Sequence, residues 1–255
     1  MRWTDGATRL RVLLPLMMFG GAGMAQQAPQ APDATTVVQA PAPSVPAVPS
    51  APRAAVTPRF LVVLDAAHGG QDIGARFSDG ELEKDITLSI SVRLRSTLSA
   101  HGIGVVTTRE SDANLSSTAR AEAANGATAA ACILIHATAT GSGVHLYTSS
   151  LAPAALTKFM PWQTAQSAYV TQSLKLSSEI DSALAHAEIP VTLGRTSLQP
   201  MDSFACPAVA VEVAPLQEGS TTRGKNISDI GYQKSVIDAL TAAMDQWRND
   251  WRQQP

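Results

Sequence analysis

The chain has 255 residues, 45% of them hydrophobic, and its 19 basic and 21 acidic residues give a formal net charge of −2. A protein that binds nucleic acid would carry a basic face, so this balance argues against that class. The two cysteines are too few for a small scaffold built on disulfides.

Residues 1–25 have the features of a secretory signal peptide. Three arginines precede an apolar segment, and the small-x-small sequence Gly-Met-Ala ends at Ala25. The apolar segment is shorter than the roughly 20 residues that cross a bilayer, so we expect cleavage after Ala25 and no stable membrane span. We therefore expect an exported protein, either periplasmic or extracellular.

Residues 26–58 have a different composition. Of these 33 residues, 8 are Pro and 9 are Ala, and only Asp33 and Arg53 are charged. Such a segment has too few aromatic and branched apolar side chains to bury a core, so we expect a disordered, locally PPII-like linker. The linker is either a spacer across a wall or periplasm or an inert leader, and the sequence leaves both readings open.

Residues 59–255 are long enough to form one domain with a substantial core. Apolar segments predict strands, and apolar residues at helical spacing predict helices between them. The strands are expected at 61–64, 105–108, 130–135, 144–148 and 208–213, with helices from Glu83 to Gly102, from Ser116 or Ser117 to Gly126, and over 163–187 and 229–248. This alternation predicts an α/β fold with a mixed, mostly parallel sheet covered by helices on both faces.

Four ionisable residues carry the candidate chemistry. His68 and His136 each follow an apolar strand, where open α/β sheets bind ligands, and Glu83 begins a helix. Glu212 lies inside the apolar run PAVAVEVA, where a carboxylate needs a partner, a metal or a raised pKa. Two imidazoles and a carboxylate are a typical catalytic zinc set, and a further carboxylate suits a general base. By spacing alone this signal is weak, because a single polar residue after a strand is more often part of a turn.

Several segments, in order, resemble the zinc-dependent N-acetylmuramoyl-L-alanine amidases of the amidase-3 family. The segment LDAAHGGQDIGA resembles the family's DAGHGGxDxGA, LEKDITLSISVRL its EKDxTLxIAxxL helix, and TTRESDANLSSTARAEAAN its TRxxDxxLxxxxRxxxAN stretch. CILIHATAT is similar to the SIHAN strand, GVHLYTSS to the strand after it, and PAVAVEVAPL to PAVLVEVGFL. The resemblance covers residues 61–250.

The resemblance implies a role for each of the four residues. His68, Glu83 and His136 stand where the family binds its catalytic zinc ion (Zn²⁺), and Glu212 stands at the family's catalytic glutamate. The implied reaction is hydrolysis of the amide between N-acetylmuramic acid and L-alanine of the stem peptide in peptidoglycan. Two alternatives remain: a catalytically inactive relative that binds peptidoglycan or regulates other proteins, and a zinc carboxypeptidase acting on wall peptides. A regulatory protein partner cannot be identified from the sequence.

The chain departs from the family pattern beside these residues. Ala67 replaces the glycine before the first histidine, and if that position requires a positive φ, alanine would be strained by roughly 1–2 kcal/mol. Thr138 replaces the asparagine after the second histidine, and Ala214-Pro215 replaces Gly-Phe after the glutamate. None of these changes removes a candidate ligand.

Other polar residues are weaker candidates for the site. Asp65, expected to begin the turn before His68, and Asp72 could orient the His68 imidazole, or each could cap a turn through its own backbone. Thr138 could support the site or contact substrate. His145, which alternates along a strand, is expected to face solvent or a groove wall.

The two cysteines, Cys132 and Cys206, each lie in or beside an apolar strand-like segment. Free buried thiols are common in such places. Export makes a disulfide chemically possible, but the sequence leaves open whether the two residues pair.

Overall fold

A computed structural model of the chain describes residues 60–218 and 224–252. The expected signal peptide at 1–25 and the linker at 26–58 lie outside these residues. In the part of the chain that is described, none of the helices has the length and apolar character needed to cross a membrane.

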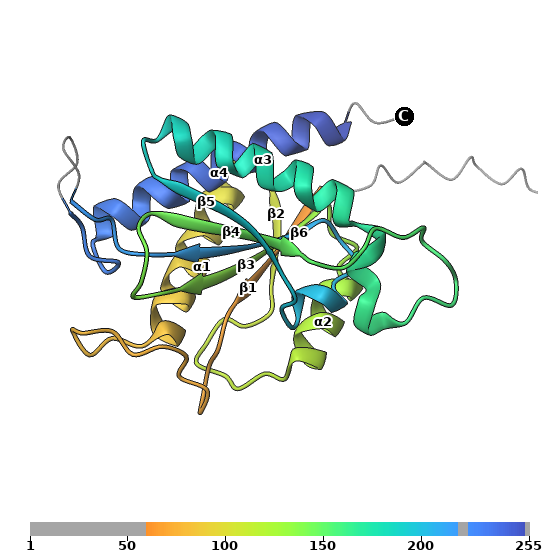
Figure 1. The fold of residues 1–255 in the computed structure, drawn as a ribbon, viewed down its shortest axis with the longest axis horizontal. Helices are drawn as coiled ribbons and strands as arrows, with labels where there is room; N and C mark the ends of the chain where they lie inside the picture. Colours follow the sequence, from red (N-terminus) through yellow and green to blue (C-terminus); the bar gives the residue numbers. More distant parts are fainter. Residues whose placement is uncertain (1–59, 219–223, 253–255) are drawn as a thin grey trace, which may run out of the picture. The chain divides into compact units, whose positions relative to one another are not determined.

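Six strands form one mixed sheet in the order β2-β1-β3-β6-β4-β5 (Figure 1). Strands β2, β1, β3 and β6 run parallel to one another, whereas β4 is antiparallel to β6 and β5 is parallel to β4. The predicted mixed, mostly parallel sheet is therefore confirmed. The strands are β1 (Leu61–Ala66), β2 (Gly104–Thr107), β3 (Ala131–Ala137), β4 (Val144–Ser149), β5 (Val191–Thr196) and β6 (Ala208–Val213).

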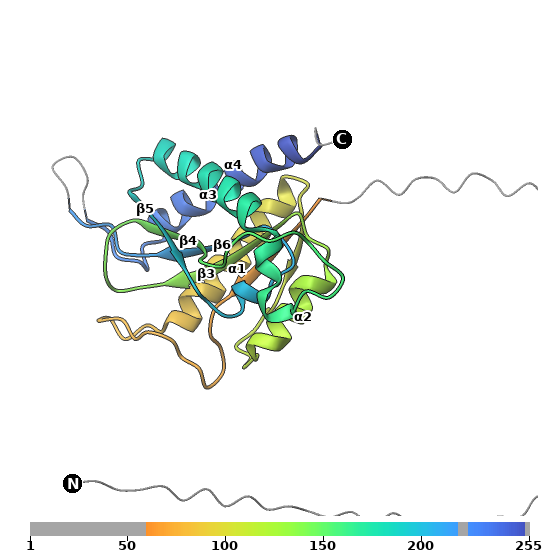
Figure 2. The same ribbon diagram turned by 45° about the vertical axis from the view of Figure 1, so that its right-hand side comes forward.

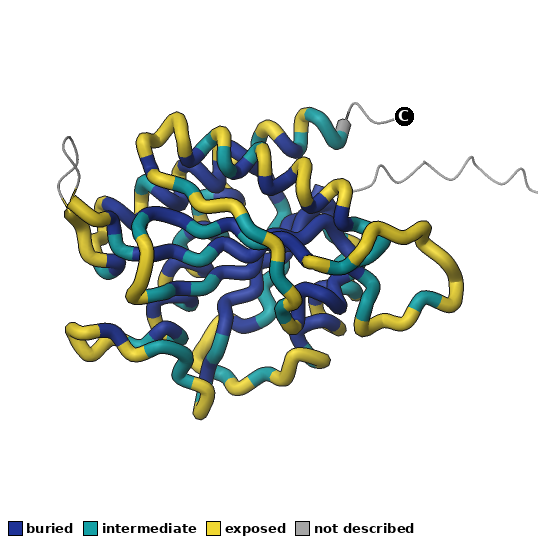
Figure 3. The backbone as a smooth tube through the Cα atoms, in the orientation of Figure 1, coloured by how far each residue is buried: buried dark blue, intermediate teal, exposed yellow. Residues whose placement is uncertain are grey.

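Helices cover both faces of this sheet, as Figure 2 shows. One face packs against α1 (Glu83–Ala100), α3 (Val170–His186) and α4 (Ile230–Arg252). The other face packs against α2 (Ser117–Gly126) and the short 3₁₀ segment η2 (Met201–Ser203). Strands β1, β3 and β6 lie between these layers and are buried along most of their length (Figure 3).

Local sequence explains where the first two helices begin and end. Helix α1 has Glu83 and Asp85 in its first turn, where negative charge favours the helix dipole. It buries apolar residues at four-residue spacing, and Gly102 follows it with a φ of 72°. Helix α2 is capped by Ser116, whose hydroxyl accepts a hydrogen bond from the Ala119 N–H at 3.1 Å.

Three sequence-based predictions about the elements are wrong. Asp65 does not begin a turn, because it lies inside β1 and is buried. The single helix expected over 163–187 is divided into the 3₁₀ segment η1 (Trp162–Ala168) and α3. Strand β5 was not predicted, since this edge strand is largely exposed and has few apolar residues.

The division between η1 and α3 has a side-chain cause. The buried Gln166 donates hydrogen bonds to the carbonyl oxygens of Phe204 and Cys206, both at 2.9 Å. Its own carbonyl oxygen accepts a hydrogen bond from Ser173 at 2.6 Å. These contacts hold η1 against the segment that precedes β6 instead of letting it continue the axis of α3.

Cys132 and Cys206 form a disulfide, with their Cα atoms 6.1 Å apart. Both residues are buried. The bond joins β3 to the segment just before β6 on the face that carries α2. The sequence had left this pairing open.

Candidate active site

Three ionisable residues lie side by side across neighbouring strands. His136 on β3 is the register partner of Glu212 on β6, and Glu212 is the register partner of His145 on β4. Register partners on adjacent strands point to the same face of a sheet, so these side chains form one row. The row lies on the face that carries α2, because Ala210, two residues before Glu212, packs in that layer.

The three candidate metal ligands come together beside this row. Glu83 Oε2 lies 3.1 Å from His68 Nε2, and Glu83 Oε1 lies 3.2 Å from His136 Nδ1. One ligand atom from each of the three residues lies within 4.8 Å of the others. They come from the loop after β1, the first turn of α1 and the end of β3, so the fold gathers residues that are far apart in the sequence.

The Glu83 carboxylate is held in its ionised form. Burial acts to raise its pKa, but hydrogen bonds from His136 and His68 and from the N–H groups of Ala75 and Ala137 lower that pKa well below its usual range. The Glu83 side chain is 8% exposed. Glu83 is therefore a buried anion whose two oxygens face two imidazoles.

The His68 imidazole is oriented from both of its nitrogens. Its Nδ1 lies 2.9 Å from Asp72 Oδ1, which also accepts the Gly74 N–H at 3.2 Å. The hydrogen bond to Glu83 raises the His68 pKa against the effect of burial, and Asp72 raises it further. Asp72 thus contacts the imidazole and caps a turn at the same time.

Two buried arginines hold the backbone turn that carries His68. Arg120 donates to the carbonyl oxygens of Ala66 and His68, at 2.6 and 2.5 Å. Arg109 donates to the carbonyl oxygens of Ala66 and Ala67, both at 2.9 Å. The residues with positive φ in this turn are His68, at 61°, Gly69 and Gly70, and not Ala67, so the strain anticipated at Ala67 does not arise.

Asp65 does not contact the His68 ring. Its Oδ1 accepts hydrogen bonds from Arg120 at 2.8 Å and from Thr108 at 2.5 Å. It therefore supports the turn through Arg120 rather than by orienting the imidazole. Thr138 is similarly engaged within its own loop, where its hydroxyl oxygen lies 3.1 Å from that of Thr140.

A cavity of about 280 Å³ adjoins His136 and Glu212. Tyr147 on β4 forms part of its wall, and burial together with the charge of Glu212 raises the Tyr147 pKa. Gly194 on β5 makes room for that ring, since a Cβ at this glycine would lie 2.8 Å from two ring carbons. The remaining wall residues are Thr196, Leu198 and Ala210.

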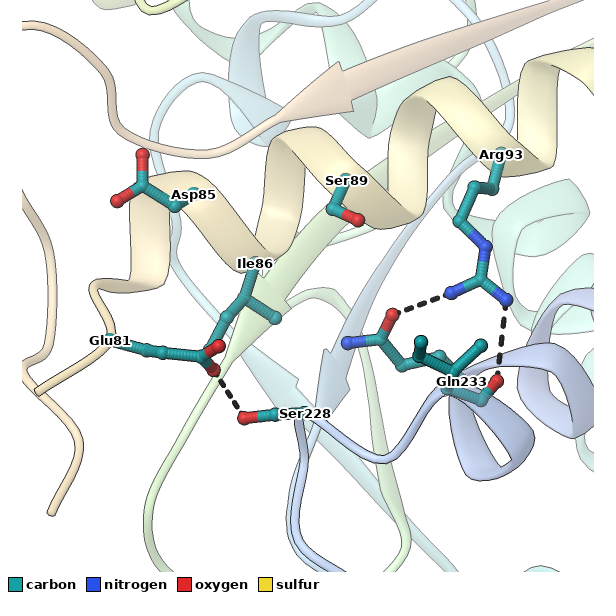
Figure 4. Close-up of a pocket in the computed structure, with 8 residues that line it drawn as sticks. Glu81, Asp85, Ile86, Ser89, Arg93, Ser228 and Gln233 are labelled. Carbon is teal, nitrogen blue, oxygen red and sulfur yellow. Dashed lines mark hydrogen bonds between the residues drawn. The ribbon is translucent and has the colours of Figure 1, made fainter. Parts of the chain in front are cut away.

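A larger cavity, of about 540 Å³, lies between the first turns of α1 and the start of α4 (Figure 4). Four of its polar side chains are hydrogen-bonded in pairs. Arg93 donates to Gln233 at 2.7 Å, and Ser228 donates to Glu81. None of its lining residues is a histidine or a candidate ligand, whereas the smaller cavity adjoins both His136 and Glu212.

His145 makes a contact that the sequence did not predict. It was expected to face solvent or a groove wall, yet its Nδ1 lies 2.7 Å from Glu212 Oε2. A signal was present in the apolar run around Glu212, since a carboxylate there requires a partner. The identity of that partner depends on the antiparallel register of β4 and β6, which the sequence does not specify.

Known proteins resemble the chain in sequence over limited stretches. It is 43% identical over 84 residues to an endolysin of Bacillus phage SPP1, a match that covers 32% of this chain and 31% of the relative. It is 35% identical over 106 residues to the N-acetylmuramoyl-L-alanine amidase AmiA of Escherichia coli strain K12, covering 39% and 37%. The matches therefore span about a third of the length of these curated relatives.

Solved structures resemble the chain over most of its described part. The amidase AmiC2 of Nostoc punctiforme superposes with a TM-score of 0.57 at 22% identity, covering 74% of this chain and 97% of that one. The amidase Ami1 of Mycobacterium smegmatis gives a TM-score of 0.59 at 21% identity, covering 75% and 97%. At these identities the likeness establishes the fold.

Comparison with protein-family models matches residues 62–246 to Amidase_3, described as N-acetylmuramoyl-L-alanine amidase. The match covers all six strands except the first residue of β1, and it extends into α4. It includes His68, Glu83, His136 and Glu212. The chain therefore belongs to the Amidase_3 family of N-acetylmuramoyl-L-alanine amidases.

Proposed function

We propose that this protein is a zinc-dependent amidase that hydrolyses the bond between N-acetylmuramic acid and L-alanine of the stem peptide in peptidoglycan. The observation that carries the proposal is the convergence of His68, Glu83 and His136 within 4.8 Å beside Glu212. Family membership supports the reaction class. The amide substrate would lie in the cavity that adjoins His136 and Glu212.

The donor set fits a catalytic zinc ion. Two imidazoles and one carboxylate are a common protein contribution to such sites, and they leave a coordination position for the reaction. The depressed pKa of Glu83 keeps this ligand anionic at neutral pH. When bound, Zn²⁺ supplies Lewis acidity that polarises the scissile carbonyl and makes water a better nucleophile.

Glu212 is the residue of the protein that transfers the proton in this reaction. Its side chain is 29% exposed and faces the cavity, so substrate and water can reach it. As general base, its carboxylate takes a proton from the attacking water, and as general acid it returns that proton to the leaving amine of L-alanine. The Asp72 and Arg120 contacts keep His68 in place during this transfer.

Two arginines could serve the carboxypeptidase alternative, Arg76, which is exposed, and Arg195, which is already engaged. Such an enzyme would usually need an arginine free to hold the terminal carboxylate of its substrate. The Arg195 guanidinium donates to the Ser149 carbonyl at 3.0 and 2.8 Å and to the Leu151 carbonyl at 2.8 Å. Because the chain also matches the Amidase_3 family, we favour the amidase, in an exported protein that meets peptidoglycan in the periplasm or outside the cell.

Digestion of purified sacculi tests the proposed function. The zinc-loaded protein should release whole stem peptides with a new N-terminal L-alanine, detected by mass spectrometry, and chelation of the zinc should stop the release. Single amino acids freed from peptide ends would instead indicate a carboxypeptidase. Zinc-loaded protein that binds sacculi and leaves them intact would indicate the inactive, wall-binding relative.

Gly74→Ala should weaken zinc binding about 10–100-fold, the usual loss when the surroundings of metal ligands are disturbed. A Cβ at Gly74, which has a φ of 63°, would lie 2.6 Å from Glu83 Oε2 and 2.7 Å from His68 Cδ2. Gly102→Ala is the matched control, because its φ is 72° but its Cβ would meet nothing within 4 Å. Both variants should lose about 1–2 kcal/mol of stability from the backbone alone. Equal zinc affinity in competition titrations of the two would contradict the steric argument.

A further inference from the structure

The Glu212 carboxylate has one oxygen engaged and one open. Oε2 lies 2.7 Å from His145 Nδ1. Within residues 60–218 and 224–252, Oε1 accepts no hydrogen bond. Because an ionised carboxylate can only accept, Nδ1 of His145 must carry the hydrogen in this contact. The two oxygens of Glu212 are therefore not equivalent.

The His145 ring is itself held in place. A Cβ added at Gly141 would lie 2.4 Å from both Cε1 and Nε2 of the imidazole, so the backbone of the 138–143 loop closes over that edge of the ring. Tyr147 lies edge-on to the imidazole, with ring centroids 6.5 Å apart. The His145 side chain is 14% exposed. A ring packed in this way can hold the direction of a partner carboxylate.

We propose that His145 is a positioning residue for the reaction, fixing Glu212 through Oε2 so that Oε1 exchanges the proton. This inference rests on the proposed amidase function. A general base acts efficiently only when its accepting atom is already directed at the proton, and a third group that orients the base is a recurrent solution. His145 belongs to neither the ligand set nor the substrate cavity lining, so it acts only through Glu212.

Kinetics of the full-length, zinc-loaded protein on a soluble MurNAc–L-alanyl peptide provide the first test. His145→Ala should lower kcat about 10–100-fold, as expected when the partner of a reacting group is lost, with KM and zinc content unchanged. His145→Asn should recover most of that loss, because its side-chain amide nitrogen stands near the position of Nδ1. A His145→Ala protein with parental kcat, or one whose deficit His145→Asn does not reduce, would overturn the proposal.

A double-mutant cycle separates positioning from general damage. In a Glu212→Ala background, adding His145→Ala should cost no further activity, since the group that His145 positions is already missing. An equal fold-loss in both backgrounds would show that His145 acts elsewhere. Loss of zinc from His145→Ala would also overturn the proposal, because the residue would then support the metal rather than the base.

A spectroscopic readout keeps this test separate from that of the amidase function. In protein with ¹⁵N-labelled histidine, His145 should show the tautomer with hydrogen on Nδ1, assigned by the loss of its signals in His145→Asn. In Glu212→Ala it should change to the tautomer with hydrogen on Nε2. If that change occurs in a protein that releases no wall peptides, the His145–Glu212 contact stands and the amidase function fails. If His145 has the same tautomer in Glu212→Ala as in the parent protein, the positioning role is overturned, whatever the activity.

Discussion

Glu83→Gln and Glu212→Gln should separate zinc binding from catalysis. The Glu83 variant should lose zinc and peptide release together. The Glu212 variant should keep zinc at the parental stoichiometry and release wall peptides about 10²–10⁴-fold more slowly, the range typical of a lost general acid–base group. Both substitutions preserve side-chain shape, so they change charge and hydrogen bonding more than packing.

The expected loss of zinc from Glu83→Gln follows from its surroundings. Glu83 accepts hydrogen bonds from the backbone N–H groups of Ala75 and Ala137, at 2.9 and 3.2 Å. Each of its oxygens also faces one imidazole. A glutamine has only one carbonyl oxygen for these donors, and its amide brings no negative charge to a metal that prefers an anionic ligand here.

Glu212 differs because it lies beside the ligand candidate His136, on the adjacent strand, without belonging to the group of candidate ligands. Its replacement by Gln removes the proton acceptor and leaves His68, Glu83 and His136 unchanged. Zinc content by elemental analysis and peptide release by mass spectrometry measure the two effects on the same samples. Zinc lost from both variants, or retained in both with equal activity, would contradict this division of roles.

Much of the fold could be predicted because its strands are continuous apolar segments. The prediction of 208–213 for β6 agrees with the structure, and Glu83 begins α1 as expected. These segments are buried on both faces, so hydrophobicity alone identifies them. Edge strand β5, with the sequence VTLGRT, packs on fewer neighbours and lacks such a signal.

Sequence-based predictions were wrong or incomplete where the partner of a residue comes from a distant segment of the chain. Asp65 reads locally as a turn residue, but Arg120, 55 positions later, compensates its charge and allows it to lie in β1. His145 was expected to face solvent or a groove wall, and its contact with Glu212 was missed because that contact depends on the antiparallel pairing of β4 with β6. In both cases the deciding information is a pairing between segments, which no local pattern contains.

Arg120→Met should lower the free energy of unfolding by about 3–5 kcal/mol, the usual cost of breaking a buried ion pair by removing one partner. Arg120 and Asp65 side chains are 6% and 1% exposed, and their N–O distance is 2.8 Å. Asp65 Oδ2 has no hydrogen-bond partner in the described part of the chain, so the hydrogen bonds that stabilise the buried carboxylate all go to Oδ1. Methionine would fill a similar volume but leave the carboxylate without its ion-pair partner.

An exposed ion pair is the matched control. Lys234 Nζ lies 2.6 Å from Asp238 Oδ2, yet the two side chains are 67% and 52% exposed. Lys234→Met should therefore cost less than about 1 kcal/mol in the same denaturant titration. A loss for Arg120→Met no larger than for this control would contradict the account of Asp65 as a buried charge that depends on Arg120.

The double variant Asp65→Leu, Arg120→Met tests whether charge or turn geometry matters more. Removing both charges should restore part of the stability lost in Arg120→Met, because apolar replacements often substitute for a buried ion pair. It should not restore zinc affinity, because the carbonyls of Ala66 and His68 would still lack the guanidinium that holds them. Stability and zinc binding that recover together would mean that the turn holds His68 without Arg120.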